Sequence, residues 1–140
     1  MLEKLELSDE EWRKRLSPEE YQVLRQHGTE RPGSGCFLGT KTPGTYVCAG
    51  CGNPLFASGR KFESGTGWPS FTEPVGKDSV TNIEDHTYGM VRTEVRCARC
   101  DGHLGHVFPD GPPPTGQRYC MNSAAMKHVP EGQPIVLAKK

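Results

Sequence analysis

The chain has 140 residues, with 17 basic and 17 acidic side chains, 17 Gly, 12 Pro and 6 Cys. Leu, Ile, Val and Phe together make up 25 residues, or about 18% of the chain, below the roughly 20% that marks a chain with an ordinary core. The zero net charge argues against a disordered chain and against a nucleic-acid-binding protein, and no apolar stretch approaches the roughly 18 residues of a membrane span.

Two short helices are predicted at the N-terminus, over about residues 9–16 and 18–27. Each begins with the capping-box pattern of Ser followed three residues later by Glu, and the second has Pro at its first helical position. Gly28 is expected to end the second helix, because glycine readily takes the left-handed conformation found at helix ends.

From residue 29 onward, Gly and Pro recur too often for long helices, and short strand patterns take over. The strands are expected within residues 45–47, 89–96, 117–121 and 135–137. The fold class is therefore mainly β, an antiparallel β domain with short N-terminal helices. We assign residues 1–28 to a helical cap that belongs to the same domain as residues 29–140.

Four of the six cysteines form two C-x-x-C pairs, Cys48 with Cys51 and Cys97 with Cys100. In a chain without a secretory signal, two such pairs indicate a four-thiolate structural zinc site (Zn²⁺) more readily than disulfides. A dithiol redox motif of the thioredoxin type is the alternative, but neither pair opens a helix in a β-α-β context. Zinc would also supplement the thin core.

Cys120 lies in the segment RYCMNS, where strand alternation puts Arg118, Cys120 and Asn122 on one face. A guanidinium close by favours the thiolate, which is the reactive form of cysteine. A lone cysteine is, however, more often a small buried apolar residue than a nucleophile.

Upstream, the segment DGHLGHVFPD supplies the imidazoles of His103 and His106 and the carboxylate of Asp110. If this segment pairs beside the Cys120 strand, a cysteine–histidine site with an orienting carboxylate becomes possible. A metal-binding or hydrogen-bonded structural histidine pair is the alternative.

Three long segments resemble the B-type methionine sulfoxide reductases: SGTGWPSF at 64–71, RCARCDGHLGHVF at 96–108 and RYCMNSA at 118–124. They occur in the family's order, and the resemblance extends from about residue 8 to 129. It implies two antiparallel β-sheets and a structural zinc. It also implies the stereospecific reduction of methionine-R-sulfoxide, free or within proteins, as a repair of oxidative damage with thioredoxin as reductant.

The resemblance also implies roles for individual side chains. Cys120 is the expected nucleophile, which attacks the sulfoxide sulfur and becomes a sulfenic acid. Trp68, together with Phe108, is expected to form an apolar wall for the substrate methyl group, although an isolated Trp is usually a core residue. The polar surround comprises His103, His106, Asp110, Arg118 and Asn122. Either histidine could be the acid that protonates the sulfoxide oxygen.

One position departs from the common family pattern, in which many members carry the resolving cysteine where this chain has Thr66. The remaining cysteine, Cys36, lies in the glycine-rich segment RPGSGCF. Our hypothesis is that Cys36 condenses with the Cys120 sulfenic acid and that thioredoxin reduces the resulting disulfide. The alternative is an idle Cys36 and direct reduction by an external thiol.

Two other function classes compete with an enzyme: a zinc-ribbon-like binding module, and a chaperone-like relative that keeps the scaffold without catalysis. Neither explains why Arg118, Cys120 and Asn122 should share a face. We also expect a cytoplasmic monomer that binds neither membrane nor nucleic acid, because the start lacks a signal peptide and no heptad pattern is present. His27, His86 and His128 receive no functional role.

Overall fold

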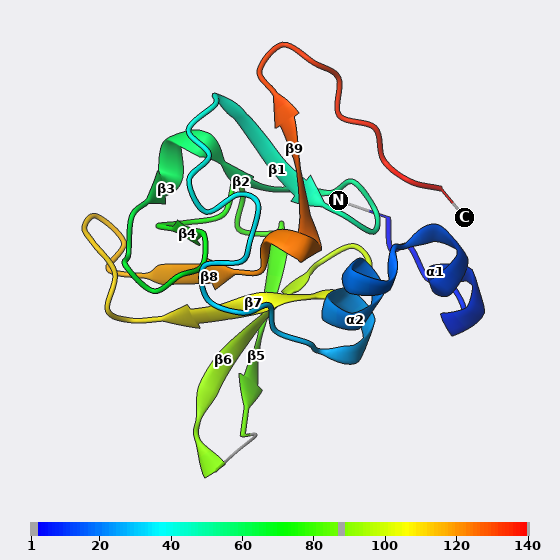
Figure 1. Cartoon of the computed structure of the whole chain (residues 1–140), viewed down its shortest axis with the longest axis horizontal. Coiled ribbons are helices and arrows are strands. Elements are labelled where there is room, and N and C mark those ends of the chain that lie inside the picture. The colour runs from blue at the N-terminus through cyan, green and yellow to red at the C-terminus, as the bar shows by residue number, and fades with distance from the viewer. Residues whose placement is uncertain (1–2, 87–88, 140) are drawn as a thin grey trace.

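The computed structural model describes residues 3–86 and 89–139. Two short helices precede two antiparallel β-sheets, as the sequence predicted, and they pack at one end of the larger sheet (Figure 1). Among the described residues, none of the helices is long and apolar enough to cross a membrane.

The two helices are α1, Asp9–Arg15, and α2, Pro18–Gln26. Ser8 and Ser17 cap them, and at the second cap both reciprocal hydrogen bonds of the capping box are present. The expected ends are confirmed to within one residue, but the expected stop at Gly28 is wrong. His27 takes the left-handed conformation instead, with φ of 56°, and its ring Nδ1 lies 3.1 Å from Oε2 of Glu94.

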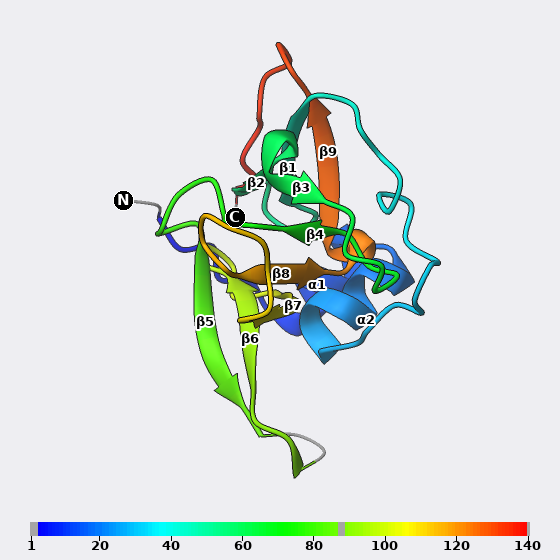
Figure 2. The ribbon, with the colours of Figure 1, turned by 90° about the vertical axis from the view of Figure 1, so that its left-hand side faces the viewer.

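The larger sheet has six strands in the order β3-β4-β8-β7-β6-β5. Their bounds are β3 Lys61–Phe62, β4 Ser70–Phe71, β5 Val80–Asp85, β6 Arg92–Cys97, β7 His103–Phe108 and β8 Arg118–Met121. The hairpin of β5 and β6 extends beyond the rest of the sheet (Figure 2). Strands β7 and β8 lie in the middle of the sheet, so their backbones are paired on both sides.

The smaller sheet has three strands in the order β2-β1-β9, with bounds β1 Gly44–Cys48, β2 Pro54–Ala57 and β9 Met126–Pro130. Short 3-10 turns, η1 at Ser58–Arg60 and η3 at Ser123–Ala125, precede β3 and β9. The strands expected at 45–47 and 117–121 are confirmed. The run expected at 89–96 becomes a strand only from Arg92, and residues 87–88 lie outside the described part.

The strand expected at 135–137 is wrong. These three residues have no regular structure, and their side chains are partly or largely exposed. The tail instead crosses the turn at Cys51, whose carbonyl accepts the N–H of Ala138 at 2.9 Å. Arg99 donates to both carbonyls, of Cys51 at 2.8 Å and of Ala138 at 2.6 Å.

The core joins the two sheets through aromatic rings. Phe71 of the larger sheet stacks on Phe56, with ring centroids 4.5 Å apart, and meets the edge of Tyr46 at 5.2 Å. All three are fully buried. The helices add Trp12 and Leu24, which lie within van der Waals reach of the Gly50 turn. This continuous core holds the central strands in place.

Candidate active site

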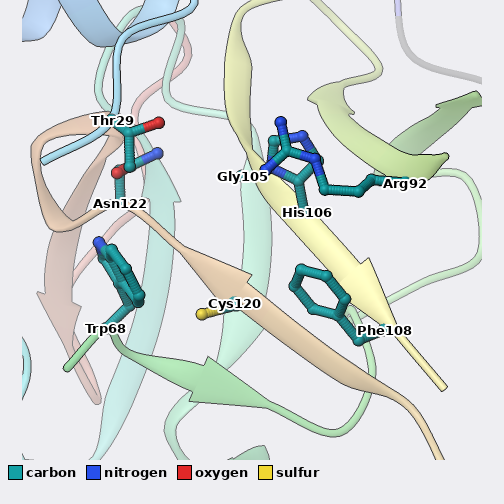
Figure 3. A pocket seen from close by; sticks show the side chains of 8 residues that line it. All are labelled: Thr29, Trp68, Arg92, Gly105, His106, Phe108, Cys120 and Asn122. Atoms are coloured by element: carbon teal, nitrogen blue, oxygen red, sulfur yellow. The ribbon is translucent and has the colours of Figure 1, made fainter. Parts of the chain in front are cut away.

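Cys120 lies on the central strand β8, opposite Ser70 of β4 and His106 of β7. It opens into a cavity of about 100 Å³ (Figure 3). The lining residues are Thr29, Trp68, Arg92, Gly105, His106, Phe108, Cys120 and Asn122. Of the sequence-predicted site residues, Cys120, His106, Asn122 and both aromatic residues therefore share one cavity.

Trp68 and Phe108 flank the Cys120 sulfur from opposite sides (Figure 3). The indole Nε1 of Trp68 donates to the carbonyl of Glu30 at 2.9 Å, which fixes the ring against the segment after α2. The Arg118 guanidinium lies 4.4 Å from the centroid of the Phe108 ring, close enough for a cation–π contact. The cavity therefore has two held apolar walls.

His106 faces the cavity and has a carboxylate partner from another strand. Its Nε2 lies 2.9 Å from Oδ2 of Asp85, and the same oxygen accepts a hydrogen bond from Arg92 at 3.3 Å. Sequence reasoning missed Asp85, which is 21 residues from His106. Only the pairing of β5 with β6 and of β6 with β7 brings the two together.

His103 lies behind His106 rather than on the cavity. Its side chain is 3% exposed, its Nδ1 lies 2.7 Å from Oε2 of Glu94, and its ring is 5.5 Å from that of His106. Burial lowers the pKa of His103, and the hydrogen bond to Glu94 only partly opposes this. His103 is therefore neutral near neutral pH.

Asp110, the expected orienting carboxylate, pairs with Arg118 through two hydrogen bonds of 2.9 and 3.2 Å. This pair lowers the pKa of Asp110 and raises that of Arg118, to which Cys120 adds a smaller contribution. The contribution from Cys120 indicates that the guanidinium is within electrostatic reach of the sulfur. Asp110 thus acts on Arg118, whereas Asp85 contacts the histidine.

The amide of Asn122 is held by the backbone on both sides. Its Nδ2 donates to the carbonyl of Leu104 at 3.0 Å, and its Oδ1 accepts the N–H of Glu30 at 2.9 Å. Glu30 therefore fixes two cavity walls at once, Asn122 through its N–H and Trp68 through its carbonyl.

Cys36 is exposed and lies outside the cavity of Cys120. Neighbouring atoms still remove part of the water around its sulfur, which raises its pKa, and the charges of Glu30 and Glu19 raise it further. Its segment is nevertheless tied to the site: Phe37 donates to the Ser123 hydroxyl at 3.2 Å, and Gly33 donates to the carbonyl of Gly67 at 2.7 Å. The structure holds this segment beside the strand end that carries Cys120.

A separate cluster gathers the four C-x-x-C cysteines, all buried, with sulfur atoms within 4.8 Å of one another. The Cys48–Cys100 and Cys51–Cys97 sulfur pairs are 3.6 and 3.5 Å apart, far from the roughly 2.05 Å of a disulfide. Asn53 donates to the sulfur of Cys97 at 3.5 Å. The cluster can hold a metal ion, away from Cys120.

The SelR domain model matches residues 16–130 of the chain. A relative from Pseudomonas fluorescens Pf-5 is 60% identical over 129 residues, covering 92% of this chain and 99% of that protein. A relative from Agrobacterium fabrum C58 is 57% identical over 127 residues, covering 91% and 94%. Both are named peptide methionine sulfoxide reductase MsrB. The resemblance noted in the sequence is confirmed, and this chain belongs to the SelR family, that of the B-type methionine sulfoxide reductases.

Proposed function

We propose that this protein reduces methionine-R-sulfoxide, free or within proteins, to methionine, with Cys120 as nucleophile. The main support is the cavity in which the Cys120 sulfur lies between Trp68 and Phe108, beside the His106–Asp85 pair. The curated relatives, named for methionine sulfoxide reduction, support the same reaction.

In the first step, the Cys120 thiolate attacks the sulfoxide sulfur while a proton goes to the sulfoxide oxygen. This attack forms a transient bond between the two sulfurs. The hydroxyl group then passes from the substrate sulfur to the Cys120 sulfur, the S–S bond breaks, methionine leaves, and Cys120 becomes a sulfenic acid. The substrate sulfur is reduced by two electrons and the cysteine sulfur is oxidised by two. Arg118 stabilises the attacking thiolate through its charge.

His106 is the acid in this proposal, rather than His103. The His106 ring lines the cavity, and the contact of its Nε2 with the Asp85 carboxylate orients it. His103 lies outside the cavity, and burial keeps it neutral. Asp85 and Arg92 are positioning residues for His106, and Asp110 is a positioning residue for Arg118.

The cavity offers a basis for choosing the R epimer. Trp68 and Phe108 receive the apolar methyl group, while His106 and Asn122 lie where the sulfoxide oxygen must accept a proton. Exchanging the two substituents would put the oxygen against the indole, away from His106, so the oxygen would lose its proton donor, which costs free energy.

The enzyme is then recycled through Cys36. Its thiolate attacks the sulfur of the Cys120 sulfenic acid, a Cys36–Cys120 disulfide forms, and the oxygen leaves as water with a proton from the site. The dithiol of thioredoxin reduces this disulfide. The ties between the Cys36 segment and Ser123 and Gly67 support this proposal.

Zn²⁺ fits the cysteine cluster. Four thiolates at the usual Zn–S distance of about 2.3 Å lie about 3.8 Å from one another in a tetrahedron, close to the observed 3.5 and 3.6 Å. Such a site is closed, so the ion would contribute stability and no chemistry. Cys48, Cys51, Cys97 and Cys100 would join β1 to β6 and β7 through their turns.

We further propose that residues 1–28 and 29–140 form one domain, since Trp12 and Leu24 share a core cluster with Cys48 and Leu104. The same proposal includes a monomer working in the reducing cytoplasm, which suits a chain whose cysteines are all free thiols, four of them in a cluster that could hold a metal ion.

The test is a coupled assay with each sulfoxide epimer and thioredoxin, on the wild type, Cys120→Ser and Cys36→Ser. We expect the R epimer alone to be reduced, no turnover by Cys120→Ser, and a single stoichiometric turnover by Cys36→Ser. Activity confined to the S epimer would overturn the proposed reaction. If a free thiol besides the cysteine cluster survives sulfoxide treatment of the wild type, the resolving role of Cys36 fails.

A further inference from the structure

We propose that His27, Glu94 and His103 form a second metal site, which binds a divalent transition-metal ion of the Zn²⁺ or Co²⁺ class. The three come from the end of α2, from β6 and from β7. Their ligand atoms lie within 4.8 Å of one another, and the site is distinct from the cysteine cluster.

The geometry centres on one carboxylate oxygen. Oε2 of Glu94 lies 2.7 Å from Nδ1 of His103 and 3.1 Å from Nδ1 of His27. Ligands at about 2.0–2.1 Å from a tetrahedral zinc are separated by about 3.3 Å. An ion can therefore enter between these atoms if the two imidazole nitrogens move away from Oε2 of Glu94, by about 0.6 Å for His103 and about 0.2 Å for His27.

The two buried donors, Glu94 and His103, have the net charges that a metal needs. Burial opposes ionisation of Glu94, but hydrogen bonds from Arg96 and His103 outweigh it and lower the pKa of the carboxyl group. Burial likewise keeps His103 neutral by lowering its pKa. A carboxylate and a neutral imidazole are the ligating forms of these side chains. Metal binding at Nδ1 of His103 also requires its proton to move from Nδ1, where it faces Glu94, to Nε2 of the same ring.

The neighbouring residues leave the proposed ligand atoms accessible to an ion. Arg96 binds the other carboxylate oxygen of Glu94, Oε1, at 3.0 Å, which leaves Oε2 to the two imidazoles. The buried Nε2 of His103 has no hydrogen-bond partner among the described residues, so no second contact fixes its tautomer. The His27 side chain is 55% exposed, which gives an ion a path of entry and a coordination position for water.

The site explains the unusual backbone conformation of His27 and predicts an effect on stability. His27 is a non-glycine residue in the left-handed conformation, with φ of 56°, which directs its ring towards His103 at a centroid distance of 5.3 Å. A bound ion would also tie the end of α2 to β6 and β7. Since only the folded chain brings the three ligands together, the ion should raise the melting temperature.

The experiment uses zinc-loaded protein carrying Cys36→Ser and Cys120→Ser, so that no free thiol competes. Titration with Co²⁺ and with Zn²⁺ should reveal one ion beyond the one held by the cysteines. The added Co²⁺ should show visible d–d absorption without new thiolate charge-transfer bands, and added Zn²⁺ should raise the melting temperature.

His27→Ala in this background should weaken binding at least tenfold and abolish the thermal shift. His86→Ala is the matched control, because His86 is an exposed histidine with its own carboxylate partner, Glu84, at 3.4 Å. It should change nothing. A parent protein that binds no second ion, or a His27→Ala variant that binds it with unchanged affinity, overturns the proposal. Circular dichroism and the cysteine-bound zinc content verify that each variant is folded.

Discussion

The hydroxyl oxygen of Thr66 lies 3.6 Å from the sulfur of Cys120. The same hydroxyl is within 2.8 Å of the Ser64 hydroxyl, which is in turn 2.7 Å from that of Ser70. Thr66 thus lies where a side chain could bond directly to the reactive sulfur, and where many family members are expected to carry a resolving cysteine. In this chain that contact cannot become covalent.

Thr66→Cys should therefore create a new resolving cysteine. In a Cys36→Ser background we expect one turnover of sulfoxide to be followed by a disulfide between the introduced thiol and Cys120, with recovery of thioredoxin-dependent turnover. Peptide mapping of the non-reduced protein by mass spectrometry measures the bond. Thr66→Ser is the control and should stay limited to one turnover. An introduced thiol that remains free after the sulfoxide is consumed would contradict the expectation.

Loss of the proposed acid should slow the first step. A general acid typically contributes about 10²–10⁴-fold to rate, and His106→Ala should lower kcat/KM for the R epimer by a factor in that range. Asp85→Asn keeps the imidazole but removes the carboxylate that orients it, so we expect a smaller loss of kcat/KM than for His106→Ala. His128→Gln, on the smaller sheet, should match the wild type. Equal rates for wild type and His106→Ala would remove this residue from the mechanism.

At neutral pH, Cys36 should form the disulfide with Cys120 more slowly than a cysteine with an unshifted pKa would. Because partial desolvation and the charges of Glu30 and Glu19 raise the pKa of Cys36, the thiolate fraction at neutral pH is small. The rate of this step should rise with pH and level off only in the alkaline range. The rate can be measured by adding one equivalent of sulfoxide, stopping the reaction at set times with a thiol-alkylating reagent, and counting the free thiols that remain.

Glu19→Gln removes one of these charges, so its rate profile should move to lower pH. Glu10→Gln, on the surface of α1, should leave the profile in place. Coincident profiles for wild type and Glu19→Gln would mean that another step limits the reaction.

Stripping zinc should unfold the protein. Structural zinc binding in small domains amounts to about 10–16 kcal/mol, comparable to or larger than the roughly 5–15 kcal/mol of net stability of a folded domain. We expect a strong chelator to abolish the near-UV circular dichroism and the cooperative thermal transition, and equimolar Zn²⁺ to restore both. A metal-free protein that keeps its cooperative transition would show that the core is sufficient.

Local patterns in the sequence predicted much of this fold. The capping boxes at Ser8 and Ser17 located both helices, because a cap depends on residues only three positions apart. The stop at Gly28 was wrong because a contact distant in sequence decided it: the ring of His27 is held by Glu94, and this favours the left-handed conformation at His27. The apolar run 135–137 failed as a strand because it has no strand partner among the described residues.

The candidate site divides in the same way. The motifs predicted that Cys120, His106 and Asn122 share a site, because strand alternation and the pairing of β7 with β8 involve residues close in sequence. It could not supply Asp85, whose position depends on the register of three strands. Nor could it reveal that Glu30 holds both Trp68 and Asn122, since those hydrogen bonds come from its main chain.

The central position of β8 fixes which part of the protein can move during recycling. A strand paired on both sides exchanges its amide hydrogens only when the sheet opens, whereas the turns around Cys36 belong to neither sheet. If the two sulfurs meet, Cys36 must move towards Cys120. Hydrogen exchange of the reduced and disulfide forms should therefore differ in residues 31–40 and coincide along Arg118–Met121. Catalysis by this chain would then combine a nucleophile, Cys120, that stays in place with a resolving cysteine, Cys36, that moves to reach it.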